Sequence, residues 1–187
     1  GLDRIKGIIT DLKRYSHTGN REMHAVNLNE EIQGALNIVR HDLQEKTKII
    51  RKFGPLPPVK CYANQLNQVF MNILINASQA LENGGTITIS TFASEGTVSV
   101  LIQDTGPGIA PENIKDIFKP FFTTKAVGVG TGLGLYLSRD IIERHQGRLS
   151  VESRLGAGTT FMISLPIFVA QVHPSTAFDA EKTLPAA

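Results

Sequence analysis

The sequence predicts an α+β fold in which three helices cover one face of a β-sheet. Three helical stripes of apolar residues alternate along the chain with short runs rich in Thr, Val and Ile. Glycine-rich turns separate these segments. Because a sheet and an amphipathic helix each bury one apolar face, this mixture is typical of a two-layer α/β sandwich with its ligand on the helical side.

Composition limits the classes of partner. The 187 residues, 41% of them apolar, suffice for one compact domain with short attachments. Lys and Arg number 19 against 17 Asp and Glu, with no block of like charge, so we expect neither nucleic-acid binding nor membrane contact. No apolar run approaches the ~20 residues that a membrane span needs. A single cysteine, Cys61, excludes an internal disulfide and favours a reducing compartment, so a cytoplasmic location is expected.

The beginning of the chain predicts a helix followed by a linker. Apolar residues recur there at helical spacing, at Ile5, Ile8, Ile9, Leu12 and Tyr15. This stripe predicts half of a helical hairpin, and the polar residues after it predict a hinge. With no initiator Met, the chain is expected to be a piece of something longer. The expected parts are a hairpin remnant at 1–18, a linker at 19–26, a folded domain at 27–166 and a tail or linker at 167–187.

Two core helices and an edge strand are predicted in the first half of the domain. The first helix begins after Asn27, whose spacing to Glu30 is that of a capping pair. Its apolar stripe consists of Leu28, Ile32, Ala35, Leu36, Val39 and Leu43. A β-type run at 48–53 is expected to pair with residues 59–62. The second helix is expected to be capped by Asn64, and its buried face carries Leu66, Val69, Phe70, Ile73, Leu74, Ala77 and Leu81.

A hairpin, a third helix and two further strands are predicted in the second half. Residues 86–92 and 97–103 read as strands joined at Glu95-Gly96. The third helix runs from Leu135 to His145 and is closed by Gly147. Strands at 148–153 and 159–165 then flank a glycine-rich turn.

Two amides four residues apart, Asn72 and Asn76, project from one side of the second helix. An amide oxygen is a hard, neutral ligand suited to a magnesium ion that keeps several waters and bridges nucleotide phosphates. The alternative is that both are ordinary helix amides bonded to neighbouring loops, and the pair alone does not decide.

Two glycine-rich segments have the features of ligand-binding loops. Asp104 stands at a strand end before Gly106 and Gly108, where a partly buried carboxylate would accept a hydrogen bond from the exocyclic amine of adenine. The alternative is a plain Asx turn. Residues 130–135, GTGLGL, lead directly into the third helix, so main-chain N–H groups and the positive helix end would face an anion. No Gly-Lys-Ser/Thr follows, which excludes a Walker loop.

Residues 118–125, FKPFFTTK, connect the two glycine-rich segments. Lys125 could reach phosphates from here as a point charge, or it could be a solvated surface lysine. Phe118 and Phe121 are expected to pack in the core.

The order and spacing of these segments resemble the catalytic domain of sensor histidine kinases. The wider ATPase superfamily is shared with type II topoisomerases, the large heat-shock chaperone and mismatch-repair ATPases. Residues 68–80, QVFMNILINASQA, resemble the asparagine box of that family, and DTGPGI, FKPFFTTK, GTGLGL and GAGTTF resemble its other boxes. The resemblance covers about 26–166 and implies a Bergerat-type fold with a mixed, mostly antiparallel sheet. Gln79 and the short segment after Lys125 look most like the nitrogen-regulation subgroup, which implies a short ATP lid.

The resemblance also implies ATP and Mg2+ as cofactors. Asn76 would hold the metal ion, Asp104 would bind the adenine amine, and Thr160 would support the base through water. Asn72 and Lys125 would take part in catalysis. The implied nucleotide-binding residues are Asn72, Asn76, Gln79, Asp104, Gly106, Gly108, Ile109, Thr124, Lys125, Gly130, Thr131, Gly132, Leu133, Gly134, Leu135 and Thr160. Related hydrolases have a glutamate where Asn72 stands, and an amide cannot take a proton, so transfer rather than hydrolysis is expected.

No residue of this sequence fits the phosphate-accepting histidine of those kinases. Their acceptor lies on a helical hairpin and is followed by Glu or Asp and then by Asn and Pro. His41-Asp42 is the nearest imitation, but it lacks the Asn-Pro and is predicted inside the first core helix. His17, His24, His145 and His173 have no acidic neighbour placed to orient the ring.

The expected partners follow from the same resemblance. A histidine-bearing hairpin, upstream in the parent protein or in trans, would accept the γ-phosphate, and a response-regulator receiver domain would be the next partner. The parent protein is expected to be a homodimer, and the sequence leaves open whether it is anchored in a membrane. Two alternatives of the same fold remain, a serine-type switch-protein kinase and a nucleotide-sensing module without catalysis.

Overall fold

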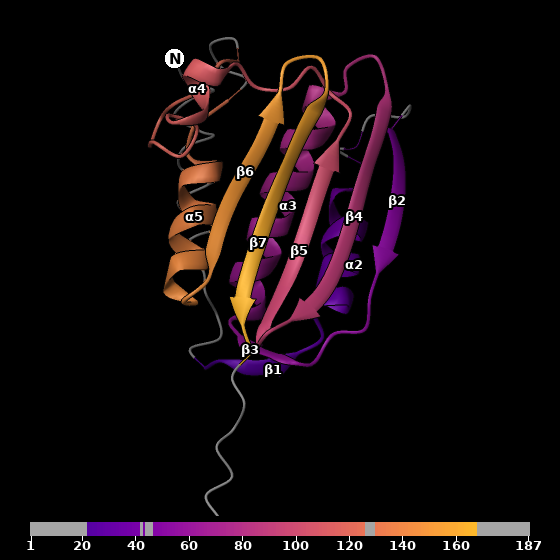
Figure 1. Ribbon diagram of the computed structural model, residues 1–187, viewed down its shortest axis with the longest axis vertical. Coiled ribbons are helices and arrows are strands. Elements are labelled where there is room, and N and C mark those ends of the chain that lie inside the picture. Colours follow the sequence, from indigo (N-terminus) through magenta and orange to yellow (C-terminus); the bar gives the residue numbers. More distant parts are fainter. Residues whose placement is uncertain (1–21, 42, 44–46, 126–129, 168–187) are drawn as a thin grey trace, which may run out of the picture.

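The fold is described from a computed structural model that covers residues 22–41, 43, 47–125 and 130–167. The predicted helix at 2–16 and nearly all of the predicted tail lie outside the described residues. Within them, one sheet and the helices behind it form two layers (Figure 1), which confirms the predicted fold class. None of the described helices is long and apolar enough to cross a membrane.

Within the described ranges, five strands form the main sheet in the order β2-β4-β5-β7-β6. They are β2 (Thr47–Phe53), β4 (Gly85–Ser94), β5 (Thr97–Asp104), β6 (Arg148–Arg154) and β7 (Gly158–Pro166). β2 runs parallel to β4, and the other three pairs are antiparallel. Glu95 and Gly96 join β4 to β5 with φ of 48° and 75°, as a tight hairpin turn with two left-handed residues requires. The sheet is therefore mixed and mostly antiparallel, as predicted.

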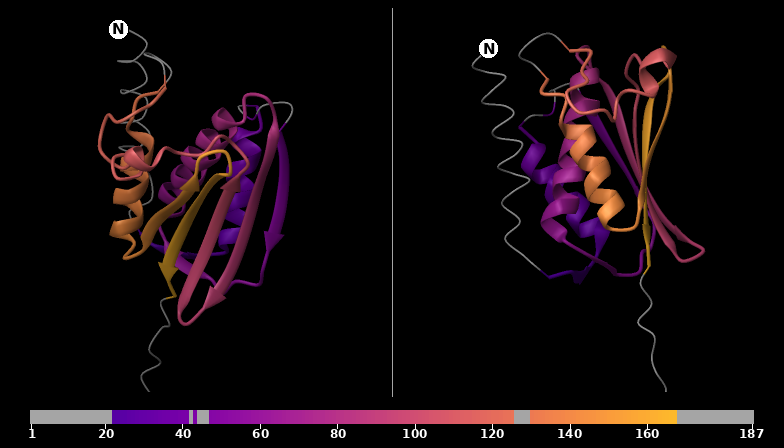
Figure 2. Two further views of the ribbon diagram at one scale, coloured as in Figure 1. Left: turned by 45° about the horizontal axis from the view of Figure 1, so that its top comes forward. Right: turned by 90° about the vertical axis from the view of Figure 1, so that its left-hand side faces the viewer.

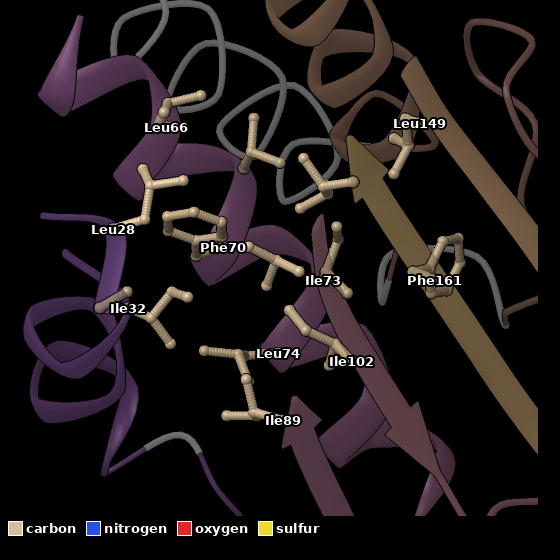
Figure 3. Packing of buried hydrophobic residues seen from close by; sticks show 14 of the residues in the cluster. Leu28, Ile32, Leu66, Phe70, Ile73, Leu74, Ile89, Ile102, Leu149 and Phe161 are labelled. Atoms are coloured by element: carbon tan, nitrogen blue, oxygen red, sulfur yellow. The ribbon is translucent and has the colours of Figure 1, made fainter. Parts of the chain in front are cut away.

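Three of the described helices cover one face of this sheet, as the right-hand view of Figure 2 shows. They are α2 (Leu28–Val39), α3 (Ala63–Ala80) and α5 (Gly134–Arg144). Phe70, Ile73 and Leu74 of α3 are fully buried and point into the core between the helices and the sheet residues Ile89 and Ile102 (Figure 3). No described helix covers the opposite face of the sheet. The apolar stripes predicted from the sequence thus face the sheet.

The expected pairing of residues 59–62 with the strand before them is wrong. β3 (Val59–Cys61) pairs with β1 (His24–Val26), whereas β2 pairs with β4. Parallel strands need a long crossover, and here α3 supplies it, so β2 finds a partner far along the chain. Residues 24–26, which sequence analysis places in a linker, are consequently part of the folded body.

Two helix boundaries also differ from expectation. α3 begins at Ala63 after Tyr62, so Asn64 lies inside the helix and does not cap it. α2 ends at Val39, and His41 lies beyond it in a turn. The cap predicted at the start of α2 is confirmed, since Asn27 Oδ1 accepts the Asn29 N–H at 3.0 Å.

The predicted ligand segments gather at one end of the sandwich, drawn at the top of Figure 1. α3 and β5 both end there, and α5 begins there. The connection between β5 and α5 also contains α4 (Pro111–Ile114), a single helical turn that sequence analysis does not predict. The topology alone therefore brings the asparagine helix, the Asp104 turn and the glycine-rich start of α5 to the same edge.

At the opposite end of the sandwich, His145 is buried at the end of α5. Its Nδ1 lies 2.7 Å from the Ile141 carbonyl oxygen, and its Nε2 accepts the Tyr62 N–H at 3.0 Å. The two rings meet edge to face, with centroids 5.5 Å apart. Burial lowers the pKa of His145, so the neutral ring is favoured and serves as a structural link between α5 and the start of α3.

Candidate functional site

Asn72 connects the middle of α3 to the first turn of α5. Its Nδ2 donates to the Gly134 carbonyl oxygen at 3.2 Å and to Ser138 Oγ at 3.2 Å. Ser138 is buried and also donates to the Gly134 carbonyl, at 2.8 Å. Because α5 begins at Gly134, this amide fixes the end of the glycine-rich segment against α3.

Asn76 and Gln79 lie one helical turn further along α3 and together hold a positive charge. Lys125 Nζ donates to Asn76 Oδ1 at 3.0 Å and to Gln79 Oε1. Residues three apart on a helix are neighbours on its surface, so both oxygens can face one cation. Burial lowers the pKa of Lys125, which means that the two amides hold an ammonium group partly removed from water.

The oxygen atoms that surround the Lys125 ammonium indicate whether these residues could also hold Mg2+. Mg2+ prefers hard oxygen ligands, and Asn76 already presents an amide oxygen to a cation, so the residues fit the ion. Among the described residues no group of three or more His, Cys, Asp or Glu could hold a metal. A magnesium ion at this place would therefore rely on the amide oxygen, on water and on oxygens that the ligand brings.

Asp104 ends β5 with its side chain buried beneath the helices. Its Oδ1 accepts the Gly106 N–H at 2.8 Å, the contact of an Asx turn. Burial raises the pKa of Asp104, and the N–H groups of Gly106 and Thr159 oppose this effect. A carboxylate so placed is a strong acceptor for a ligand donor, because little water competes for it.

The loop after Asp104 is fixed on two sides. A Cβ at Gly106 would lie 3.1 Å from the Cβ of Ala80 in the last turn of α3. Gly108 has a φ of 76°, and a Cβ there would lie 2.2 Å from the Arg154 carbonyl oxygen. This loop therefore runs in contact with both α3 and β6, and only glycine fits at 108.

Ser153 of β6 completes this anchorage. Its Oγ accepts the Ile109 N–H at 2.8 Å and lies 2.9 Å from both the Gly158 carbonyl oxygen and Thr159 Oγ1. No local pattern in the sequence marks Ser153, because its role depends on a contact between residues 44 positions apart. The hydroxyl joins the Asp104 loop to the β6–β7 hairpin.

Thr159, not Thr160, stands beside Asp104. Thr159 pairs with Asp104 in the β5–β7 ladder and is buried, so both side chains lie on the helix-facing side of the sheet. Thr160 pairs with the exposed Gln103 and faces the other side. The strand register therefore places Thr159, rather than Thr160, on the same side of the sheet as Asp104. The alternation of buried residues after it, Phe161, Ile163 and Leu165, carries the signal that could have identified Thr159.

The GTGLGL segment, residues 130–135, is held mainly by main-chain contacts. Gly132 has a φ of 72°, and a Cβ there would lie 2.4 Å from the main-chain carbonyl carbon of Phe121. Phe121 in turn donates its N–H to the Gly132 carbonyl at 2.9 Å. Thr131 Oγ1 accepts the N–H of Leu133, the residue before α5, at 3.3 Å. Residues 126–129, between Lys125 and this segment, lie outside the described ranges.

Phe121 corrects one expectation from the sequence. It adopts a left-handed φ of 65° and its side chain is 54% exposed, so it does not pack in the core. Phe118 is partly buried and packs against the core as expected, with the Arg139 guanidinium 5.4 Å from its ring centre. Phe121 differs from Phe118 because its main chain is hydrogen-bonded to Gly132, and this contact turns the Phe121 side chain outward.

Taken together, the structure places the predicted residues in two adjoining groups. Around Asn72, Asn76 and Gln79 lie Lys125 and Gly134, joined to them by hydrogen bonds. The Asp104 group adjoins the end of α3 through the contact of Gly106 with Ala80. Thr124 is exposed next to Lys125. The arrangement offers an acceptor at one end, amide oxygens in the middle and main-chain N–H groups at the start of a helix.

Residues 61–168 match a family model described as "Histidine kinase-, DNA gyrase B-, and HSP90-like ATPase". The sensor histidine kinase ZraS of Salmonella typhi is 38% identical over 173 residues, which are 90% of this chain and 37% of that relative. This chain thus spans little more than a third of the length of that curated relative.

Solved structures of similar fold include the nucleotide-free catalytic domain of histidine kinase ThkA. It is 32% identical with a TM-score of 0.70, and the match covers 78% of this chain and 95% of that domain. A structure of ThkA in complex with the response regulator protein TrrA matches with 28% identity and a TM-score of 0.72, over 89% of this chain and 48% of that one.

Proposed function

The chain belongs to the histidine kinase-, DNA gyrase B- and HSP90-like ATPase family as the ATP-binding catalytic domain of a sensor histidine kinase, and from this premise we propose that it transfers the γ-phosphate of Mg·ATP to a histidine outside the chain. The observation that carries the proposal is the bond from Asn72 to Gly134, since it joins the helix of the amides to the start of the phosphate segment.

Asp104 is proposed to select adenine. Its buried carboxylate accepts a hydrogen bond from the exocyclic amine, which guanine lacks at the matching position. We propose Thr159 in place of Thr160 as the residue that supports the base through water, because Thr159 lies opposite Asp104 on the same face. Ile109 and the glycines at 106 and 108 line the path of the base along the same loop.

The triphosphate is proposed to lie between α3 and the start of α5. The first N–H groups of α5 have no partners within the helix, and together with its positive end they favour an anion. Residues 130–135 wrap the phosphates, and Lys125 adds a positive charge. Mg2+, when bound, would neutralise phosphate oxygens, with Asn76 Oδ1 as its ligand from the protein. Gln79 offers a second amide oxygen beside it.

The proposed chemistry is transfer with little hydrolysis. The bond between the γ-phosphorus and the β,γ-bridging oxygen breaks, ADP leaves, and the γ-phosphorus bonds to an imidazole nitrogen of the acceptor. Asn72 cannot act as a general base toward water, and its amide hydrogens already bond to Gly134 and Ser138. The residues of this chain therefore contribute by positioning the phosphates and by stabilising their charge.

The partners remain proposals because the chain spans a minority of its relatives' length. A histidine-bearing hairpin would present the acceptor and form a homodimer, and a receiver domain would take the phosphate onward. The complex of ThkA with TrrA is an example of a related kinase with such a partner. Because β1 pairs with β3, we propose a hairpin remnant at 1–18, a linker at 19–23, a catalytic domain at 24–166 and a tail or linker at 167–187. The cytoplasmic location and the nitrogen-regulation subgroup stay predictions.

The test mixes the chain with γ-labelled ATP, Mg2+ and a separate histidine-bearing hairpin. Label on the hairpin that is stable to base and labile to acid supports the kinase. Acid-stable label would instead indicate a serine-type kinase. Nucleotide binding without any transfer would favour a sensing module. A hairpin whose acceptor histidine is replaced by Gln is the control and should stay unlabelled.

A further inference from the structure

Lys125 occupies the place that the proposed function assigns to a metal ion. Its ammonium group bonds to Asn76 Oδ1 and Gln79 Oε1, and both oxygens belong to residues proposed to face Mg·ATP. We infer that Lys125 is an internal counter-cation of the metal site, which holds these oxygens when nucleotide is absent and must leave them when Mg·ATP binds. This inference rests on the proposed function and adds a step to it.

The exclusion follows from charge. The ammonium lies 3.0 Å from Asn76 Oδ1, the oxygen that the proposed function assigns to the metal ion. A magnesium ion bound to the same oxygen would bring two positive charges into close contact in a partly buried place, where water screens them poorly. The ammonium therefore withdraws from this oxygen when the metal ion arrives.

The lysine is also coupled to the phosphate segment. Thr123 Oγ1 accepts the Lys125 N–H at 3.2 Å. A Cβ at Gly130 would lie 2.7 Å from Thr123 Oγ1 and 3.3 Å from Lys125 Cδ, so the main chain at 130 passes directly over this pair. Withdrawal of the side chain of Lys125 consequently changes what Gly130 packs against. The exchange of cations thus transmits the arrival of Mg·ATP to the segment that wraps the phosphates.

A lysine that only touched phosphates would behave differently. In that case, loss of its charge would weaken ATP binding by the same factor with and without metal. If instead the ammonium and the metal ion exchange on one site, the charge of Lys125 stabilises bound ATP when the metal ion is absent. Its loss should then weaken metal-free binding far more than binding of Mg·ATP.

The experiment measures the affinity of ATP by calorimetry, with excess Mg2+ and with a chelator, for the unmodified chain and for Lys125→Met. The quantity of interest is the ratio of the metal-free Kd to the Kd with Mg2+. We expect Lys125→Met to raise this ratio about tenfold or more, the size of one charge-assisted hydrogen bond. Lys119→Met is the matched control from the same segment, since Lys119 is 67% exposed and pairs with Asp116, and it should leave the ratio unchanged.

A second variant keeps the test valid if Lys125→Met does not fold. Gln79→Leu removes one of the two acceptors and should raise the ratio in the same direction by a smaller factor. An unchanged ratio in both variants, with ATP still bound, overturns the exchange and leaves the proposed function intact. If the unmodified chain binds no ATP under either condition, the proposed function itself is wrong, and the exchange falls with it.

Discussion

The side-chain amide of Asn72 donates a hydrogen bond to the main-chain carbonyl oxygen of Gly134 across 62 positions of sequence. The acceptor is the first residue of α5, and the donor lies in the middle of α3. A side chain proposed to contact the nucleotide therefore also links two helices of the site, α3 and α5. Substitutions here should affect stability and binding together.

Asn72→Asp should destabilise the chain by about 1–3 kcal/mol, because a carboxylate cannot donate to Gly134 and would face its carbonyl oxygen. Urea denaturation without nucleotide measures the effect. The matched control is Asn37→Asp, an exposed amide of α2 that accepts a bond from Gln33, and it should stay within about 0.5 kcal/mol of the unmodified chain. Equal stabilities for the two variants would contradict the structural role of Asn72.

Asp104→Asn should keep or raise the stability of the nucleotide-free chain while it removes ATP binding. Burial raises the pKa of Asp104, so its contribution to stability is present below its ordinary pKa of 3.8 and is lost as the pH rises through the folded value. At neutral pH the buried charge is thus a cost, which the amide avoids.

Thermal unfolding measured with and without Mg·ATP checks this prediction. The unmodified chain should melt at higher temperature with nucleotide. Asp104→Asn should show no such increase. Lower stability of the variant in the absence of nucleotide would argue that Asp104 serves the fold alone.

Thr159→Val and Thr160→Val form a matched pair of neighbouring residues on opposite faces of β7. Thr159→Val should weaken ATP binding several-fold, because it removes a hydroxyl beside Asp104 that also contacts Ser153. Thr160→Val should change binding little, since its side chain lies on the face away from the helices. Calorimetric titration of both variants decides the assignment, and a larger loss at 160 would restore the original expectation.

His145 should make the chain sensitive to mild acid. Burial lowers the pKa of His145 in the folded chain, so stability should fall as the pH drops below its ordinary value of 6.5, toward the folded value. Protonation would also break the hydrogen bond from the Tyr62 N–H, because a protonated Nε2 cannot accept it.

Urea denaturation at a series of pH values measures the slope. The loss amounts to roughly 1 kcal/mol for each unit by which the pKa is lowered. His145→Gln should flatten the profile between neutral and mildly acidic pH, because it removes the buried ring that titrates there. An identical profile for the unmodified chain and His145→Gln would show that the ring titrates normally.

Local patterns predicted the elements that depend on local contacts. The stripes of α2, α3 and α5 and the β4–β5 turn are set by side chains within a few positions of one another, and they were found where expected. The pairing of β2 with β4 was missed, because it depends on α3 crossing the sheet between them. The outward turn of Phe121 was also missed, since its cause is a distant main-chain partner at Gly132.

By itself, the sequence determined the fold class, the family resemblance and the set of residues proposed to face a nucleotide, because periodicity, capping and ordered motifs are read along the chain. Only the tertiary structure decided which of these residues touch. That Lys125 lies on the oxygens of Asn76 and Gln79, and that Thr159 rather than Thr160 stands beside Asp104, depends on segments some fifty positions apart meeting at one end of the sheet. Such contacts are fixed by how α3 packs and how strands align, and no local pattern encodes them.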